Sequence, residues 1–113
     1  MSEPVQATST NLFRVGMPGG YAFQLRPGEE GLSVFAEDGV DPLLTETEVL
    51  ASFRTDSIIR TRSQHETMVA GLEVVAVEGT DNLPDRLRQS HRELRPGQGM
   101  TRAQFKQALR RLE

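Results

Sequence analysis

The chain has 113 residues, of which 36% are hydrophobic, so it can form one domain with a buried core and is too short for two. It lacks cysteine and has two histidines far apart in the sequence, which excludes disulfides and thiol chemistry and predicts no metal site. No apolar run approaches the length that crosses a bilayer, and the N-terminus lacks a basic segment followed by an apolar one. We therefore expect no membrane contact and a cytoplasmic protein.

The first third of the chain predicts short strands between turns. Residues 1–10 are polar and show no periodicity, which predicts a disordered lead-in before a single domain over residues 11–113. Residues 12–15 and 21–25 have the composition of strands and are separated by a cluster rich in glycine and proline. Residues 32–35 alternate in the manner of a third strand.

Capping signals predict the helices of the middle and the end of the chain. A Ser or Thr is followed three residues later by a Glu or Gln at three places: Thr45 with Glu48, Ser63 with Glu66, and Thr101 with Gln104. The last of these helices has a stripe of apolar residues, consisting of Phe105, Ala108, Leu109 and Leu112. We expect this amphipathic helix to pack on the sheet.

Further strands are predicted between these helices. Residues 57–61 and 91–94 have the composition of strands, and a turn of helix is expected over residues 84–89. Residues 72–77 form the most β-prone run of the chain, which we interpret as a central strand. The order of elements lacks regular βαβ units and favours the α+β class. Because the chain has no Gly-x-Gly-x-x-Gly, P-loop or Gly-x-Ser-x-Gly motif, neither a Rossmann turn nor a serine hydrolase is supported.

The net charge of −3 is unevenly distributed along the sequence. Seven acidic residues follow one another with no basic residue between them: Glu29, Glu30, Glu37, Asp38, Asp41, Glu46 and Glu48. Toward the C-terminus the balance reverses, with Arg86, Arg88, Arg92, Arg95, Arg102, Lys106, Arg110 and Arg111 against Asp85, Glu93 and Glu113. Two ordinary solvated faces would explain this distribution, and so would a phosphate-bearing ligand at one end and a cationic partner at the other.

Several short motifs occur in a specific order. An apolar run leads into Gly79-Thr80-Asp81, then Leu83-Pro84, then a His-x-x-Leu-x-Pro segment from His91 to Pro96, and finally the helix that carries Phe105. Earlier in the chain, Gly31-Leu32-Ser33-Val34-Phe35 forms a Gly-x-Ser-Val-Phe segment. This order resembles the small toxins with an ADP-ribosyltransferase-like fold that bacteria export through type VI secretion systems.

The resemblance implies a fold, a substrate and partners. The fold would be a split, curved β-sheet with short helices and a C-terminal amphipathic helix, and the substrate would be NAD. The toxin would transfer ADP-ribose to a protein or nucleic-acid acceptor in the cytosol, or hydrolyse NAD. A cognate antitoxin or immunity protein would neutralise it, because such a chain would be lethal to the cell that makes it.

The resemblance also implies the residues of the site. Arg14 or Arg26 would bind the diphosphate of NAD, since a guanidinium binds phosphate oxygens in pairs. Ser33 would support the ribose and the nicotinamide. His91 would contact a ribose hydroxyl or act as a base, with Glu93 beside it on the same strand face. We therefore expect Ser33 and His91 to face one cleft, although a solvent-facing or structural role is the simpler reading of each residue.

One departure from the family pattern keeps a second hypothesis open. The chain has no Glu-x-Glu or Gln-x-Glu pair in a suitable loop and strand, so the activity could be altered or absent. In the second hypothesis the chain is a non-catalytic interaction domain, and its Arg-rich C-terminal region binds an acidic protein or a nucleic acid.

Overall fold

Alternating residues of the strands face two hydrophobic cores, one on each side of a single antiparallel sheet. The computed structural model of the chain describes residues 10–78 and 82–113. Its strands are β1 (Asn11–Gly16), β2 (Leu32–Ala36), β3 (Ile58–Ser63), β4 (Leu72–Ala76) and β5 (His91–Pro96). Its helices are the 3₁₀ turn η1 (Glu37–Gly39), α1 (Glu46–Leu50), α2 (Gln64–Val69), α3 (Asp85–Ser90) and α4 (Arg102–Arg110). The α+β class predicted from the sequence is confirmed.

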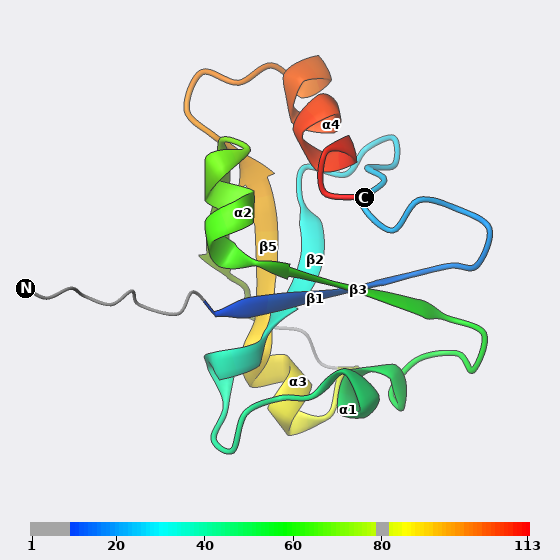
Figure 1. Cartoon of the computed structure of the whole chain (residues 1–113). Coiled ribbons are helices and arrows are strands. Elements are labelled where there is room, and N and C mark those ends of the chain that lie inside the picture. Colours follow the sequence, from blue (N-terminus) through cyan, green and yellow to red (C-terminus); the bar gives the residue numbers. More distant parts are fainter. Residues whose placement is uncertain (1–9, 79–81) are drawn as a thin grey trace, which may run out of the picture.

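The strand order is β3-β1-β2-β5-β4, and every pairing is antiparallel. Leu12 and Val34 contribute to the first core, which α4 and the loop of residues 17–31 cover. Phe13 and Phe35 contribute to the second core, which α1 and α3 cover. Figure 1 shows α4 and the pair α1 and α3 at opposite ends of the molecule. β1 and β2 therefore each bury residues on both of their faces.

The sheet opens between β1 and β2. These strands are paired only where Leu12 lies opposite Ala36 and Phe13 lies opposite Phe35. Beyond Phe13, β1 continues beside β3 as far as Gly16 and leaves β2. Figure 1 shows β1 and β3 running across the direction of β2 and β5. The unpaired part of β2 thus needs other donors for its backbone carbonyls.

Two expectations about strands are wrong. Residues 72–77 were expected to form a central strand, but β4 is at the edge of the described sheet, because β propensity measures fit to a pleated surface and not position within it. Residues 21–25 form no strand. Ala22, Phe23 and Leu25 of this segment are buried as a loop, and side chains of other elements bind its backbone.

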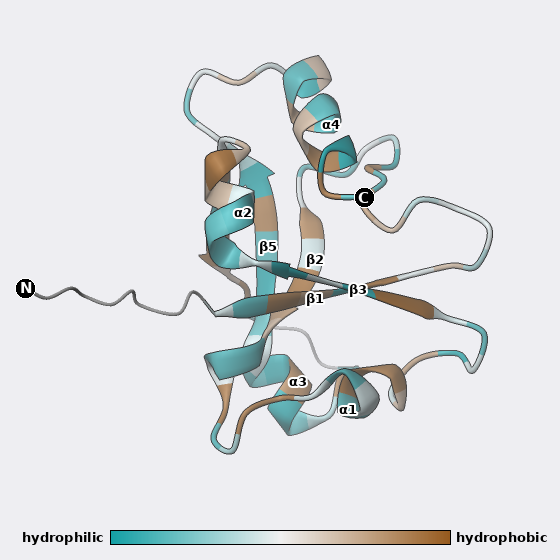
Figure 2. Cartoon of the chain, viewed as in Figure 1, coloured by the Kyte–Doolittle hydropathy of each residue, from teal (hydrophilic) through white to brown (hydrophobic). Residues whose placement is uncertain are grey.

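The capping signals identify the helix starts. The hydroxyls of Thr45, Ser63 and Thr101 each accept a hydrogen bond from the backbone three residues later. The reciprocal bond of a capping box forms at Ser63 and Thr101, whereas Glu48 pairs with Arg86 of α3. Phe105 of α4 is buried in the first core, and Figure 2 shows hydrophilic and hydrophobic residues alternating along this helix. The predicted amphipathic C-terminal helix is therefore confirmed.

Two of the sequence features lie outside the residues that the structure describes. The motif Gly79-Thr80-Asp81 is outside the described residues, as is the expected lead-in apart from Thr10. Within the described ranges, none of the helices combines the length and the apolar character needed to cross a bilayer.

Candidate functional site

Arg14 lies where β1 leaves β2. Its Nη1 donates a hydrogen bond to the backbone oxygen of Ser33 at 2.9 Å, and its Nε donates to the backbone oxygen of Ala22 at 2.6 Å. The first of these carbonyls belongs to the unpaired part of β2, and the second belongs to the loop that covers the first core. The guanidinium therefore takes the place of a neighbouring strand and fixes the opening of the sheet.

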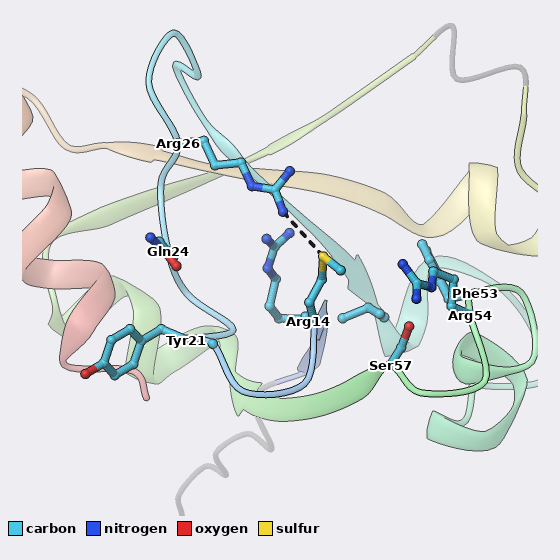
Figure 3. A pocket seen from close by; sticks show the side chains of 11 residues that line it. Arg14, Tyr21, Gln24, Arg26, Phe53, Arg54 and Ser57 are labelled. Atoms are coloured by element: carbon cyan, nitrogen blue, oxygen red, sulfur yellow. Dashed lines mark hydrogen bonds between the residues drawn. The ribbon is translucent and has the colours of Figure 1, made fainter.

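Arg14 and Arg26 line one pocket of about 240 Å³ beside this opening. The pocket, called the arginine pocket below, is also lined by the polar side chains of Tyr21, Gln24, Arg54 and Ser57. In Figure 3 the guanidinium groups of Arg14 and Arg26 lie next to each other. Nη2 of Arg26 lies 3.9 Å from the sulfur of Met17, a weak contact that leaves the Arg26 guanidinium available to a ligand.

The arginine pocket favours anions. No aspartate or glutamate among the described residues lines it. Burial lowers the pKa of Arg14 below its ordinary value, and the charge of Arg26 lowers it further, while Glu29 and Glu113 partly offset both effects. A guanidinium nevertheless stays charged at neutral pH. Two neighbouring cations in a partly buried pocket would bind a phosphate or diphosphate group in a bidentate manner.

Ser33, Glu93 and Gly31 form a polar strip on the opposite face of β2 and β5 from Leu32. Ser33 lies directly opposite Glu93 in the antiparallel register. The Glu93 side chain covers Gly31, where an added Cβ would come within 2.5 Å of its Cγ. The Glu93 carboxylate accepts a hydrogen bond from Nε of Arg95 at 2.7 Å, which orients it along the strip.

His91 lies on the same face as Ser33 but further toward the second core. It is opposite Phe35, and the two rings stack with their centroids 5.4 Å apart. His91 is buried, and desolvation lowers its pKa, with Glu93 acting in the opposite direction and Arg92 adding to the decrease. The imidazole is therefore neutral at pH 7, as a general base must be.

The structure brings some of the expected site residues together and keeps others apart. Arg14 and Arg26 share the arginine pocket, and Ser33 touches Arg14 through its backbone oxygen. Ser33, His91 and Glu93 share one face of the sheet but do not line that pocket. Arg26 lies in a loop and not at the end of a strand, because residues 21–25 are not extended.

Sequence reasoning missed Tyr21, Gln24, Arg54 and Ser57 as lining residues of the arginine pocket. Arg54 and Ser57 follow α1, and Tyr21 and Gln24 follow β1, so no motif spacing connects them. The one signal in the sequence was the cluster of glycine and proline at residues 16–20, which predicts a loop. It does not indicate which other loop lies beside it.

The charge blocks of the sequence are redistributed by the fold. Glu48 of the acidic stretch binds Arg86 of the basic stretch, with Nε to Oε2 at 2.5 Å and Nη2 to Oε1 at 3.1 Å. Glu29 of the same acidic stretch lies beside Arg102, whose Nη1 donates to its backbone oxygen at 2.7 Å. The fold therefore brings parts of the acidic and basic stretches together.

Comparison of the chain with models of protein families, with curated proteins and with solved structures finds no match. Among the described residues, no group of three or more histidine, aspartate or glutamate side chains is arranged to hold a metal ion. The function must therefore be argued from the site itself.

Proposed function

We propose that the chain is an NAD-binding toxin of the ADP-ribosyltransferase type, with the arginine pocket as the site of the diphosphate. The observation that supports this proposal best is the placement of Arg14 between β1 and β2. Its guanidinium is held by two backbone carbonyls and not by a carboxylate, so its charge is fixed in position and remains available to an anion.

The remaining residues fit a dinucleotide that crosses the opening of the sheet. The diphosphate would lie between Arg14 and Arg26, and the nicotinamide riboside would extend over β2 toward Ser33. Glu93, directly opposite Ser33, would accept a hydrogen bond from a ribose hydroxyl. His91 is too buried to reach far into solvent, so its role would be to support Phe35 and the strip beside it.

The chemistry that this arrangement supports is cleavage of the bond between the ribose C1′ and the nicotinamide nitrogen. The electron pair of that bond leaves with the positively charged ring, which becomes neutral nicotinamide. A nucleophile of the acceptor, or water, bonds to C1′ and loses a proton to solvent or to a nearby base. The protein contributes positioning and stabilisation of the charge that develops on the ribose.

A toxin of this kind requires a neutralising partner in the cell that produces it. We propose a cognate antitoxin or immunity protein that covers the arginine pocket. An acidic segment of that partner would be suited to the neighbouring positive charges of Arg14 and Arg26.

Expression in a bacterial cell without a partner tests the proposal. The chain should arrest growth and release nicotinamide from NAD, and Ser33→Ala and Glu93→Gln should relieve the arrest. Both residues are only half-buried, so these variants should remain folded, as thermal unfolding would verify. His91→Ala is a poorer variant, because it leaves a cavity beside Phe35. A harmless parent chain that does not bind NAD would contradict the proposal.

A further inference from the structure

The outer side of α4 presents cations without acidic neighbours on the same helix. Lys106 and Arg110 are four residues apart, so they lie on one side of α4, and both are exposed. Arg102 is one turn earlier on the same side. The nine residues of α4 include no aspartate or glutamate. This side of the helix is therefore positively charged.

Arg102 joins this side of α4 to the loop that carries Arg26. Its Nη2 donates to the backbone oxygen of Arg26 at 2.9 Å, and its Nη1 donates to that of Glu29 at 2.7 Å. Because carbonyls and not carboxylates hold the guanidinium, these contacts leave its positive charge in place. They also fix α4 relative to the arginine pocket.

An exposed aromatic ring lies beside these cations. Tyr21 is 58% exposed, and the guanidinium carbon of Arg110 lies 5.3 Å from the centroid of its ring. A second pocket, of about 290 Å³, lies between the loop of Tyr21 and α4, and Lys106 and Arg110 line it. The carboxylate of Glu113, at the end of the chain, accepts a hydrogen bond from the backbone amide of Phe23.

The second pocket adjoins the arginine pocket, because Tyr21 and Gln24 line both of them. The cations of α4 and the pair Arg14 and Arg26 are thus separated by one loop, with an aromatic ring on that loop. Alternation of cations with an exposed aromatic ring is the pattern by which proteins bind single-stranded nucleic acid, because cations follow the phosphates and rings stack on bases.

We infer that Tyr21, Lys106 and Arg110 form a binding surface for single-stranded nucleic acid, which is the acceptor of the ADP-ribose. This inference rests on the proposed function for the transfer step and on the structure for the binding surface. An acidic protein would also be attracted by Lys106 and Arg110, but it would gain nothing from the exposed ring of Tyr21. A duplex would not offer an unstacked base to that ring.

Fluorescence anisotropy of the full chain with a labelled oligonucleotide of about twelve nucleotides tests the surface. Arg110→Glu should weaken binding of single-stranded RNA by about tenfold or more, since it removes a phosphate contact and adds a repulsive charge. Arg111→Glu is the matched control, because Arg111 is the next residue but lines pockets on another side of α4. It should weaken binding much less. Equal effects of the two variants would overturn the inference.

The aromatic contribution has its own pair of variants. Tyr21→Ala should weaken binding by about tenfold, and Tyr21→Phe should retain most of the affinity because it keeps the ring. Single-stranded RNA and single-stranded DNA are tested in separate titrations, which identify the sugar that is preferred. Tight binding of a duplex or of an acidic polypeptide, with no effect of Tyr21→Ala, would overturn the inference.

Calorimetry with NAD separates this inference from the proposed function. Arg110→Glu should retain NAD binding and lose nucleic-acid binding, and Arg26→Ala should do the reverse. A chain that binds RNA through Tyr21 and Arg110 but does not bind NAD would contradict the proposed function and leave the binding surface established. A chain that binds NAD but is indifferent to Arg110→Glu in RNA binding would contradict the surface alone.

Discussion

Arginines at the two ends of the molecule are held in different ways. Around α3, Arg86 pairs with Glu48 and Arg88 pairs with Asp85, so these two charges are compensated by carboxylates, and Arg86 also donates to the backbone oxygen of Pro42. Around the opening of the sheet, Arg14 and Arg102 donate to backbone carbonyls. A carboxylate neutralises the guanidinium that it binds, whereas a carbonyl orients it and leaves its net charge. The ion pairs around α3 therefore stabilise the fold, whereas the arginines around Arg14 and Arg102 are suited to binding anions.

The largest difference between the two ends should appear in stability. Arg14→Ala would leave the carbonyls of Ala22 and Ser33 without their donor in a partly buried place, which costs about 1–3 kcal/mol each. We expect the free energy of unfolding to fall by roughly 2–6 kcal/mol in urea denaturation. Arg86→Ala would free a half-exposed carboxylate and the backbone oxygen of Pro42, whose bond to Arg86 is exposed to solvent, so this variant should have a smaller effect. Equal losses in the two variants would contradict the structural role assigned to Arg14.

Alanine substitutions at two glycines, Gly39 and Gly31, would test how tightly the same two ends are packed. An added Cβ at Gly39 would lie 2.6 Å from the backbone Cα of Ser90, which cannot move freely. Gly39→Ala should therefore destabilise the fold by about 1–3 kcal/mol. At Gly31 the Cβ would meet the flexible side chain of Glu93, so Gly31→Ala should cost less stability and should reduce NAD cleavage by displacing the carboxylate. Thermal unfolding and nicotinamide release measure the two effects.

Helix starts and the last helix were predictable because their signals are local. The hydroxyl of Thr101 and the side chain of Gln104 act within one turn, and the apolar stripe of Phe105 and Leu109 needs only helical periodicity. The segment 21–25 was predicted wrongly because its apolar residues are compatible with a strand or a buried loop. The contact that decides between them, from Arg14 to the carbonyl of Ala22, spans eight residues and two elements.

Of the residues that line the arginine pocket, only Arg14 and Arg26 were predicted from the sequence. Arg14 stood out as a cation between two apolar residues on a strand, but the sequence did not show that its guanidinium inserts between β1 and β2. That position depends on β1 leaving β2 after Phe13, which is a property of strand pairing. Arg54 and Ser57 enter the arginine pocket from a separate loop, so no pattern along the chain could join them to Arg14.

Salt should distinguish the two ends in binding experiments. Affinity for NAD or inorganic pyrophosphate should fall several-fold from low to high ionic strength, because cations without a carboxylate partner supply the attraction. The stability of the chain should change much less over the same range. Binding that is indifferent to salt would argue against an electrostatic role for Arg14 and Arg26.

The smallest expected effect is the pH dependence that His91 contributes. Its pKa is lowered in the folded state, so the unfolded chain binds this proton at higher pH than the folded chain does. The contribution of His91 to the free energy of unfolding is therefore fully present above the ordinary pKa of histidine. It is lost as the pH falls toward the lower pKa that His91 has in the folded state. The free energy of unfolding should therefore decrease as the pH falls below about 6.5, the ordinary pKa of histidine. His91→Phe should reduce that slope.

The most direct test of the account is calorimetric titration of the chain with NAD, repeated with inorganic pyrophosphate as a competitor. Arg26 is exposed, and its guanidinium makes only a weak contact with the sulfur of Met17 in the part of the chain that the structure describes, so Arg26→Ala should leave the fold intact. It should weaken NAD binding by about tenfold through loss of one charged hydrogen-bonding group. Arg88→Ala, at the other end of the molecule, should bind NAD like the parent chain, and pyrophosphate should compete in both. Failure of the parent chain to bind NAD, or equal binding by Arg26→Ala and Arg88→Ala, would contradict the arginine pocket as a dinucleotide site.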